Sequence, residues 1–78
     1  MAVEIRMPQW GMTLTEGTVM KWLKQRGNTV TKGEALCEVE EAKVTDTVES
    51  PVEGIVAEIL VEEGVTVPVM TPICTINE

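Results

Sequence analysis

The chain contains the segment Gly17-Thr-Val-Met-Lys-Trp-Leu-Lys-Gln-Arg-Gly27-Asn-Thr-Val-Thr-Lys-Gly33-Glu-Ala-Leu-Cys37-Glu-Val-Glu40 and, 37 residues later, a second version of it over residues 54–77. Seven of the 24 aligned pairs are identical, and they combine turn-forming glycines with residues that favour strands. The identical pairs are Gly17/Gly54, Val19/Val56, Leu23/Leu60, Gly27/Gly64, Thr29/Thr66, Val30/Val67 and Cys37/Cys74. One small β motif used twice predicts a fold with pseudo-two-fold symmetry.

Short apolar runs broken by glycine and proline predict strands throughout, and no segment has a helical period. A strand is expected at about residues 18–24, where apolar residues occupy both parities and indicate a bulge or an edge covered by the Trp10 loop. Residues 34–40 alternate, with Leu36, Glu38 and Glu40 on one face and Cys37 and Val39 on the other. We therefore predict an all-β fold, a short-stranded antiparallel sandwich.

Size and composition restrict the function. The 78 residues make one domain, 1–78, and histidine, tyrosine and phenylalanine are absent, which argues against self-contained catalysis. A net charge of −7 argues against nucleic acid and anionic membrane surfaces, and favours protein partners with basic patches. The N-terminus has no apolar signal region and the apolar runs are too short to span a membrane, so we expect a soluble intracellular protein.

Cys37 and Cys74 occupy equivalent places in the two copies, each two positions before an apolar strand residue. We expect both side chains to face the core as structural thiols, with a disulfide or a redox role as the alternative. No histidine or CxxC spacing accompanies them, so no metal site is predicted.

Lys43 lies between the two copies, where two alternating segments reverse at Glu41-Ala42-Lys43-Val44. This pattern predicts a tight hairpin with Lys43 at its tip, and the repeat offset relates this place to the chain termini, so that the two should project from opposite ends. Nearby carboxylates favour the charged ammonium, which suits a lysine modified by another enzyme better than a nucleophile. The alternative is an ordinary solvated lysine.

Four segments resemble the lipoyl domains of 2-oxo acid dehydrogenase acyltransferases, and the resemblance covers nearly the whole chain. They are Met7-Pro-Gln-Trp-Gly-Met-Thr-Leu-Thr-Glu-Gly17, Gly27-Asn-Thr-Val-Thr-Lys-Gly33-Glu-Ala-Leu36, Glu40-Glu-Ala-Lys43-Val and Ser50-Pro-Val-Glu-Gly54. The Gly-x-x-Val-x-x-Gly-x-x-Leu and Ser-Pro-Val-x-Gly patterns are shared with biotinyl carriers, whereas the opening Met-Pro-x-x-Gly-x-x-x-x-Glu-Gly is more specific to lipoyl domains.

The resemblance implies a flattened barrel of two four-stranded antiparallel sheets, with lipoic acid attached covalently to Lys43 by a lipoate ligase or lipoyl transferase. It also implies a carrier, without catalytic residues, that accepts an acyl group from a thiamin diphosphate-dependent dehydrogenase. The acyl group passes to coenzyme A on an acyltransferase core, and a flavin dihydrolipoamide dehydrogenase reoxidises the arm. The domain would be a monomer when isolated, in the cytoplasm or the mitochondrial matrix.

Some positions depart from the family pattern. The usual sequence around the lysine is Glu-Thr-Asp-Lys-Ala or Glu-Ser-Asp-Lys-Ala, so Ala42 stands where aspartate is expected. By resemblance, Glu40 and Gly27 match positions used by modifying ligases, while the flanking Glu41, Ala42 and Val44 concern recognition by the partner dehydrogenase.

Met70 replaces the glycine that matches Gly33 in the other copy, and we therefore expect a different turn there.

Two other functions remain open at this stage. A biotin carboxyl carrier would use the same barrel and the same lysine, although its lysine is usually bracketed by methionines, as Ala-Met-Lys-Met. An unmodified barrel could serve only for docking. Trp10 and Trp22 are expected to cover the small core, and Trp10 could instead shape the loop beside Lys43, as the resemblance implies.

Overall fold

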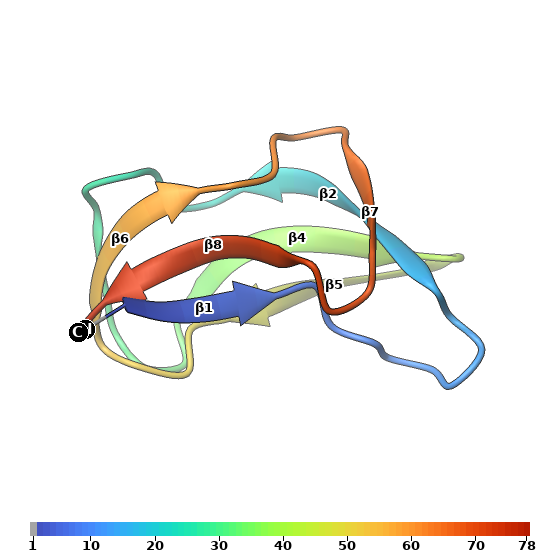
Figure 1. Cartoon of the computed structure of the whole chain (residues 1–78), viewed down its shortest axis with the longest axis horizontal. Helices are drawn as coiled ribbons and strands as arrows, with labels where there is room; N and C mark the ends of the chain where they lie inside the picture. The colour runs from blue at the N-terminus through green and yellow to red at the C-terminus, as the bar shows by residue number, and fades with distance from the viewer. Residues whose placement is uncertain (1) are drawn as a thin grey trace.

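The computed structural model describes residues 2–78 and contains eight strands in two four-stranded antiparallel sheets. The strands are β1 (Ala2–Arg6), β2 (Glu16–Trp22), β3 (Thr29–Val30), β4 (Ala35–Glu41), β5 (Val44–Glu49), β6 (Gly54–Ile59), β7 (Thr66–Pro68) and β8 (Pro72–Asn77). One sheet has the order β1-β8-β6-β3 and the other β5-β4-β2-β7, and they face each other across the core (Figure 1). The all-β prediction is confirmed, and within the described range no helix is long and apolar enough to cross a membrane.

The predicted two-fold repeat is confirmed by matching backbone hydrogen bonds. The Gly27 N–H donates to the Val56 carbonyl at 2.8 Å, and 37 residues on the Gly64 N–H donates to the Val19 carbonyl at 2.7 Å. Each turn glycine thus bonds to a strand of the other copy. The two copies interlock and form one core rather than two.

The core lies between the sheets and is formed by aliphatic, methionine, cysteine and tryptophan side chains. Its buried members are Ile5, Met7, Val19, Trp22, Val30, Leu36, Cys37, Val39, Val48, Val56, Val61, Ile73, Cys74 and Ile76. Trp22 covers the core as expected, and its indole N–H donates to the Val61 carbonyl at 2.8 Å. Both cysteines are fully buried free thiols, as the sequence predicted.

Two irregularities in pairing decide which residues point inward. The pairing of β2 with β4 shifts register between Val19 and Lys21, which confirms the predicted bulge, but β2 lies between β4 and β7 and is not an edge. A second shift lies between Ala35 and Cys37 in β4. Our placement of Leu36 on the face opposite Cys37 is therefore wrong, because the bulge turns both side chains into the core.

The turn at Met70 also contradicts the sequence-based expectation. Met70 has a φ of 71° and Gly33 a φ of 87°, so both copies use a left-handed residue at this place. The hydrogen bonds match as well, because the Met70 N–H donates to the Met7 carbonyl at 2.8 Å and the Gly33 N–H to the Ser50 carbonyl at 2.7 Å. Tertiary pairing imposes the same turn on both residues.

Met70→Gly should therefore stabilise the domain by about 0.5 kcal/mol, because relief of left-handed strain outweighs the entropy cost of glycine. The Met70 side chain is half exposed and contributes little to the core. Thermal unfolding should show a rise of about 2–4 °C for a domain of this size. The matched substitution Gly33→Met should lower the melting temperature, and a rise of the melting temperature in that variant would contradict the strain argument.

Burial raises the pKa of the Cys74 thiol to about 11, and burial together with the charge of nearby Cys74 raises that of Cys37 to about 12. The folded state keeps these protons when the unfolded chain, with thiol pKa near 9.0, releases them. The thiol contribution to stability should therefore be intact below about pH 9 and fall above it, up to about pH 11 for Cys74 and about pH 12 for Cys37, by up to about 1.4 kcal/mol per pH unit for each thiol. Denaturant unfolding across this window measures the slope. The Cys37→Ala, Cys74→Ala double variant should have a flatter slope, and equal slopes would contradict the assignment.

Candidate functional site

Lys43 lies at the tip of the β4–β5 hairpin. The last pair of the ladder is Glu41 with Val44, so Ala42 and Lys43 alone form the turn. The predicted hairpin is confirmed, and the Lys43 side chain is exposed. In Figure 1 this tip lies at the opposite end of the molecule from the beginning of β1 and the end of β8, as the repeat offset predicted.

The turn has an unusual backbone for its sequence. Ala42 has a φ of 55°, in the left-handed region where a residue with a Cβ is disfavoured by about 1–2 kcal/mol. Two-residue hairpin turns that need positive φ usually place glycine, asparagine or aspartate there. The flanking ladder, which pairs Glu40 with Thr45 and Glu41 with Val44, holds Ala42 in this conformation.

The two glutamates before the turn have different surroundings. Glu40 is half-buried and pairs with Thr18 of β2 as well as with Thr45 of β5. Glu41 is fully buried, and its Oε1 accepts a hydrogen bond of 3.2 Å from the backbone N–H of Trp10. The sequence contained a signal for this burial, because Glu41 has the same parity as Cys37 and Val39, but the reasoning from sequence did not use it.

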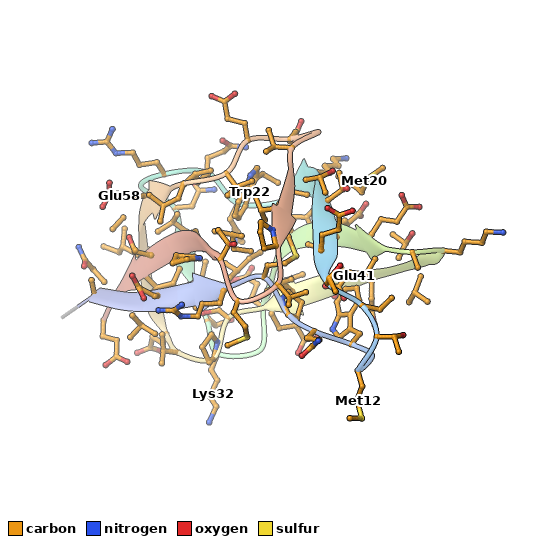
Figure 2. The ribbon with its side chains drawn as sticks, turned by 45° about the vertical axis from the view of Figure 1, so that its right-hand side comes forward. Met12, Met20, Trp22, Lys32, Glu41 and Glu58 are labelled. Carbon is orange, nitrogen blue, oxygen red and sulfur yellow. The ribbon has the colours of Figure 1, made fainter. Side chains whose placement is uncertain are left out.

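A loop at residues 7–15, between β1 and β2, lies beside the hairpin. Its backbone is held by internal bonds, from the Gln9 side-chain amide to the Leu14 carbonyl at 2.9 Å and from the Leu14 N–H to the Gly11 carbonyl at 3.0 Å. Met12 is 97% exposed and points away from the body of the domain, as Figure 2 shows. Trp10 is partly exposed, and its backbone N–H donates to Glu41 of the hairpin. Trp10 is not among the buried core residues, so the expectation that it covers the core is wrong, whereas a role of its side chain in shaping the loop stays a prediction.

The structure brings only some of the expected site residues together. Val44 is half exposed and opposes Glu41 across the two strands, so that it lies beside the turn. Gly27, by contrast, bonds through its N–H to Val56, which pairs with Ile76 near the end of β8. Gly27 therefore lies toward the other end of the domain from Lys43.

The hairpin carries no ion pair or metal cluster in the part of the chain that the structure describes. Across residues 2–78 the ion pairs are Arg6 with Glu4 and Lys24 with Glu34, at N–O distances of 2.6 and 2.7 Å. Over the same range no group of three histidine, cysteine, aspartate or glutamate residues is placed to hold a metal ion. An exposed lysine on a turn, with its ammonium in no ion pair within that range, is accessible to a modifying enzyme.

Comparison with known proteins identifies the family. Residues 3–76 match the family model described as "Biotin-requiring enzyme", which covers almost the whole chain. The chain belongs to the biotin/lipoyl domain family. A solved structure of the lipoyl domain of the 2-oxoglutarate dehydrogenase complex from Azotobacter vinelandii is 30% identical, with a TM-score of 0.81 over 97% of this chain and 96% of that chain. The predicted lipoyl-type fold and resemblance are thereby confirmed.

Curated relatives of this lipoyl domain extend far beyond it. The dihydrolipoyllysine-residue succinyltransferase component of the 2-oxoglutarate dehydrogenase complex from Staphylococcus saprophyticus is 43% identical over 96% of this chain and 18% of that protein. The dihydrolipoyllysine-residue acetyltransferase component of the pyruvate dehydrogenase complex from Corynebacterium glutamicum is 44% identical over 99% of this chain and 11% of that protein. The lipoyl domain thus spans less than a fifth of each of these two relatives. A multi-domain long-chain acyl-CoA carboxylase shares the fold, at 20% identity and a TM-score of 0.78.

Proposed function

We propose that Lys43 is the lipoyl attachment site and that the domain is the mobile acyl carrier of a 2-oxo acid dehydrogenase complex. The observation that supports this most directly is the placement of a single exposed lysine on a two-residue turn, at the end of the domain farthest from both termini. The membership in the lipoyl branch supplies the chemistry. The domain has no catalytic residue of its own in this proposal.

The residues around the turn fit an amide-linked lipoyl group. The Lys43 amine projects from a narrow tip, where neighbouring side chains do not enclose it, so a ligase can reach it and the finished arm can move. When bound, the group supplies a dithiolane that accepts an acyl group reductively and releases it to a thiol. The chain itself supplies reach and orientation through the hairpin, and a tether between the domain and the complex would keep the arm at high effective concentration near its partners.

The partners follow from this role. A lipoate ligase or lipoyl transferase attaches the group, a thiamin diphosphate-dependent dehydrogenase loads it, and an acyltransferase core passes the acyl group to coenzyme A. A flavin dihydrolipoamide dehydrogenase then reoxidises the arm. The net charge of −7 favours partner surfaces that are basic, because complementary charge steers the encounter. We propose that the carrier works in the cytoplasm or the mitochondrial matrix, which is consistent with curated relatives that include bacterial proteins and a mitochondrial one.

Lipoyl attachment is favoured over biotin attachment by the residues beside the lysine. Biotinyl domains usually bracket it with methionines, and here the neighbours are Ala42 and Val44. The relatives named above are dihydrolipoyllysine components, whereas the carboxylase neighbour shares the fold alone.

The proposal is tested by incubating the domain with lipoate, ATP and a lipoate ligase, and in parallel with biotin, ATP and a biotin ligase. Intact mass followed by peptide mapping should show one lipoyl increment on Lys43. Biotin alone at this lysine would assign the domain to carboxylase carriers, and no adduct from either ligase would leave an unmodified docking barrel.

A further inference from the structure

Glu41 is the residue directly before the turn that carries Lys43, and its side chain is fully buried. Glutamate is almost never fully buried unless it is paired, because a carboxylate loses its hydration there. Neither ion pair found in residues 2–78 includes Glu41. Its Oε1 accepts one hydrogen bond, from the backbone N–H of Trp10, while its Oε2 has no hydrogen-bond partner in the described part of the chain. Burying a carboxyl group with one oxygen unpaired is unfavourable, so the burial of Glu41 calls for a structural or functional explanation.

The surroundings of Glu41 are shaped to hold its side chain. A Cβ placed on Gly17 would lie 3.0 Å from Glu41 Cγ, 3.2 Å from its Oε2 and 2.7 Å from the Met7 sulfur. The absence of a side chain at Gly17 is therefore what leaves room for the buried carboxyl. Gly17 is the second residue of β2 and follows the loop whose Trp10 backbone N–H donates to Glu41, so these contacts join the hairpin to the loop at residues 7–15 and to the start of β2.

Contacts of this kind can hold the end of the hairpin, because its last residue pair, Glu41 with Val44, lies beyond the part of β4 that pairs with β2. Pairing of β4 with β2 ends at Glu40, opposite Thr18, whereas pairing of β4 with β5 continues to Glu41 and Val44. Beyond Glu40, β4 has no ladder partner on its β2 side. The strained turn at Ala42 follows directly, and a strained backbone keeps one conformation only where its surroundings fix it.

We propose that Glu41 is a positioning residue for Lys43: its buried carboxyl fastens the end of the hairpin to the loop at residues 7–15 and so fixes the direction in which the lysine is presented. Glu41 cannot contact a partner protein itself, because none of its surface is exposed. Its effect on a modifying enzyme passes through the turn. The inference rests on the proposed lipoyl function, since it concerns presentation of the lysine to the ligase.

The test compares Glu41→Leu, which has a similar size and no acceptor, with Glu41→Gln, whose amide oxygen can still accept the Trp10 N–H. Glu38→Leu is the matched control, because Glu38 lies on the same strand, is half-buried and faces away from the core. Two quantities are measured for each variant: hydrogen exchange of the Trp10 backbone amide by NMR, and kcat/KM for lipoylation with lipoate, ATP and a lipoate ligase. A melting curve checks that each variant is folded.

We expect Glu41→Leu to exchange the Trp10 amide at least about tenfold faster and to be lipoylated at least about tenfold more slowly. Glu41→Gln should recover both to within about threefold, and Glu38→Leu should leave Trp10 exchange unchanged. Should Glu41→Leu fail to fold, Glu41→Ala replaces it, since alanine has no side-chain acceptor for the Trp10 backbone N–H. Faster exchange with an unchanged lipoylation rate would overturn the positioning role while leaving the carrier function intact. No adduct on the unsubstituted domain would overturn both.

Discussion

Lys43→Arg should abolish lipoylation and all acyl transfer through the domain, while the free energy of unfolding changes by no more than about 0.5 kcal/mol. Arginine keeps the positive charge and a similar length, but its guanidinium cannot form the amide with lipoate. The side chain is exposed at a two-residue turn, so that no core contact is lost. Intact mass after ligase treatment measures the first effect, and thermal unfolding measures the second.

Lys32→Arg is the matched control, because Lys32 is also an exposed lysine at a turn, labelled in Figure 2. The Lys32→Arg variant should be lipoylated on Lys43 at the same rate as the unsubstituted domain. A lipoyl increment that persists in Lys43→Arg would show that another lysine is the attachment site. Loss of the increment together with unfolding would show that Lys43 supports the fold, which its exposure argues against.

Gly54→Ala should destabilise the domain by about 3 kcal/mol or more, through a clash with backbone rather than with a movable side chain. An added Cβ would lie 2.2 Å from the Asn77 carbonyl oxygen and 2.9 Å from Ile76 Cγ2. Ile55 pairs with Asn77 in the same ladder, so β6 and β8 would have to separate locally. Thermal unfolding should show a loss of about 12–25 °C for a domain of this size.

Gly11→Ala provides the control for this substitution. Its added Cβ would meet only the Leu14 side chain, at 3.3 and 3.4 Å, which a small rotation relieves. We expect a change in the free energy of unfolding of no more than about 0.5 kcal/mol. If Gly54→Ala were as mild as Gly11→Ala, the close approach of β6 to the end of β8 would be wrong.

The features that local sequence determines were predictable. Alternation on both sides of Ala42 and Lys43 fixed the hairpin, because strand period and turn length are properties of neighbouring residues. The repeat revealed the two-fold arrangement before any contact was known. Its matched hydrogen bonds, Gly27 to Val56 and Gly64 to Val19, then confirmed it.

The errors arose where contacts with another segment decide the local structure. Leu36 points inward because β4 bulges against β5, and nothing in residues 34–40 alone indicates a shift of register. Met70 keeps a positive φ because its N–H bonds to Met7, more than sixty positions earlier in the chain. In both cases a contact with another segment, β5 for Leu36 and Met7 for Met70, outweighs the preference of the residue itself.

The site was only partly predictable for the same reason. The position of Lys43 followed from the hairpin, and the proximity of the Trp10 loop followed from the resemblance. The Glu41 contact could not be found that way, because it depends on the missing side chain at Gly17 and on the path of the loop. Gly27 was grouped with Glu40 by motif, yet it lies at the other end of the domain.

The buried cysteines have a chemical consequence for a protein that carries sulfur on an arm. An exposed thiolate on the domain would attack the arm's disulfide ring and trap it in a mixed disulfide. Burial raises the pKa of Cys74 to about 11 and that of Cys37 to about 12, so both thiols stay protonated near neutral pH, and neither is exposed to solvent. The domain can therefore keep two cysteines for packing and still leave the arm as the one sulfur group that takes part in exchange.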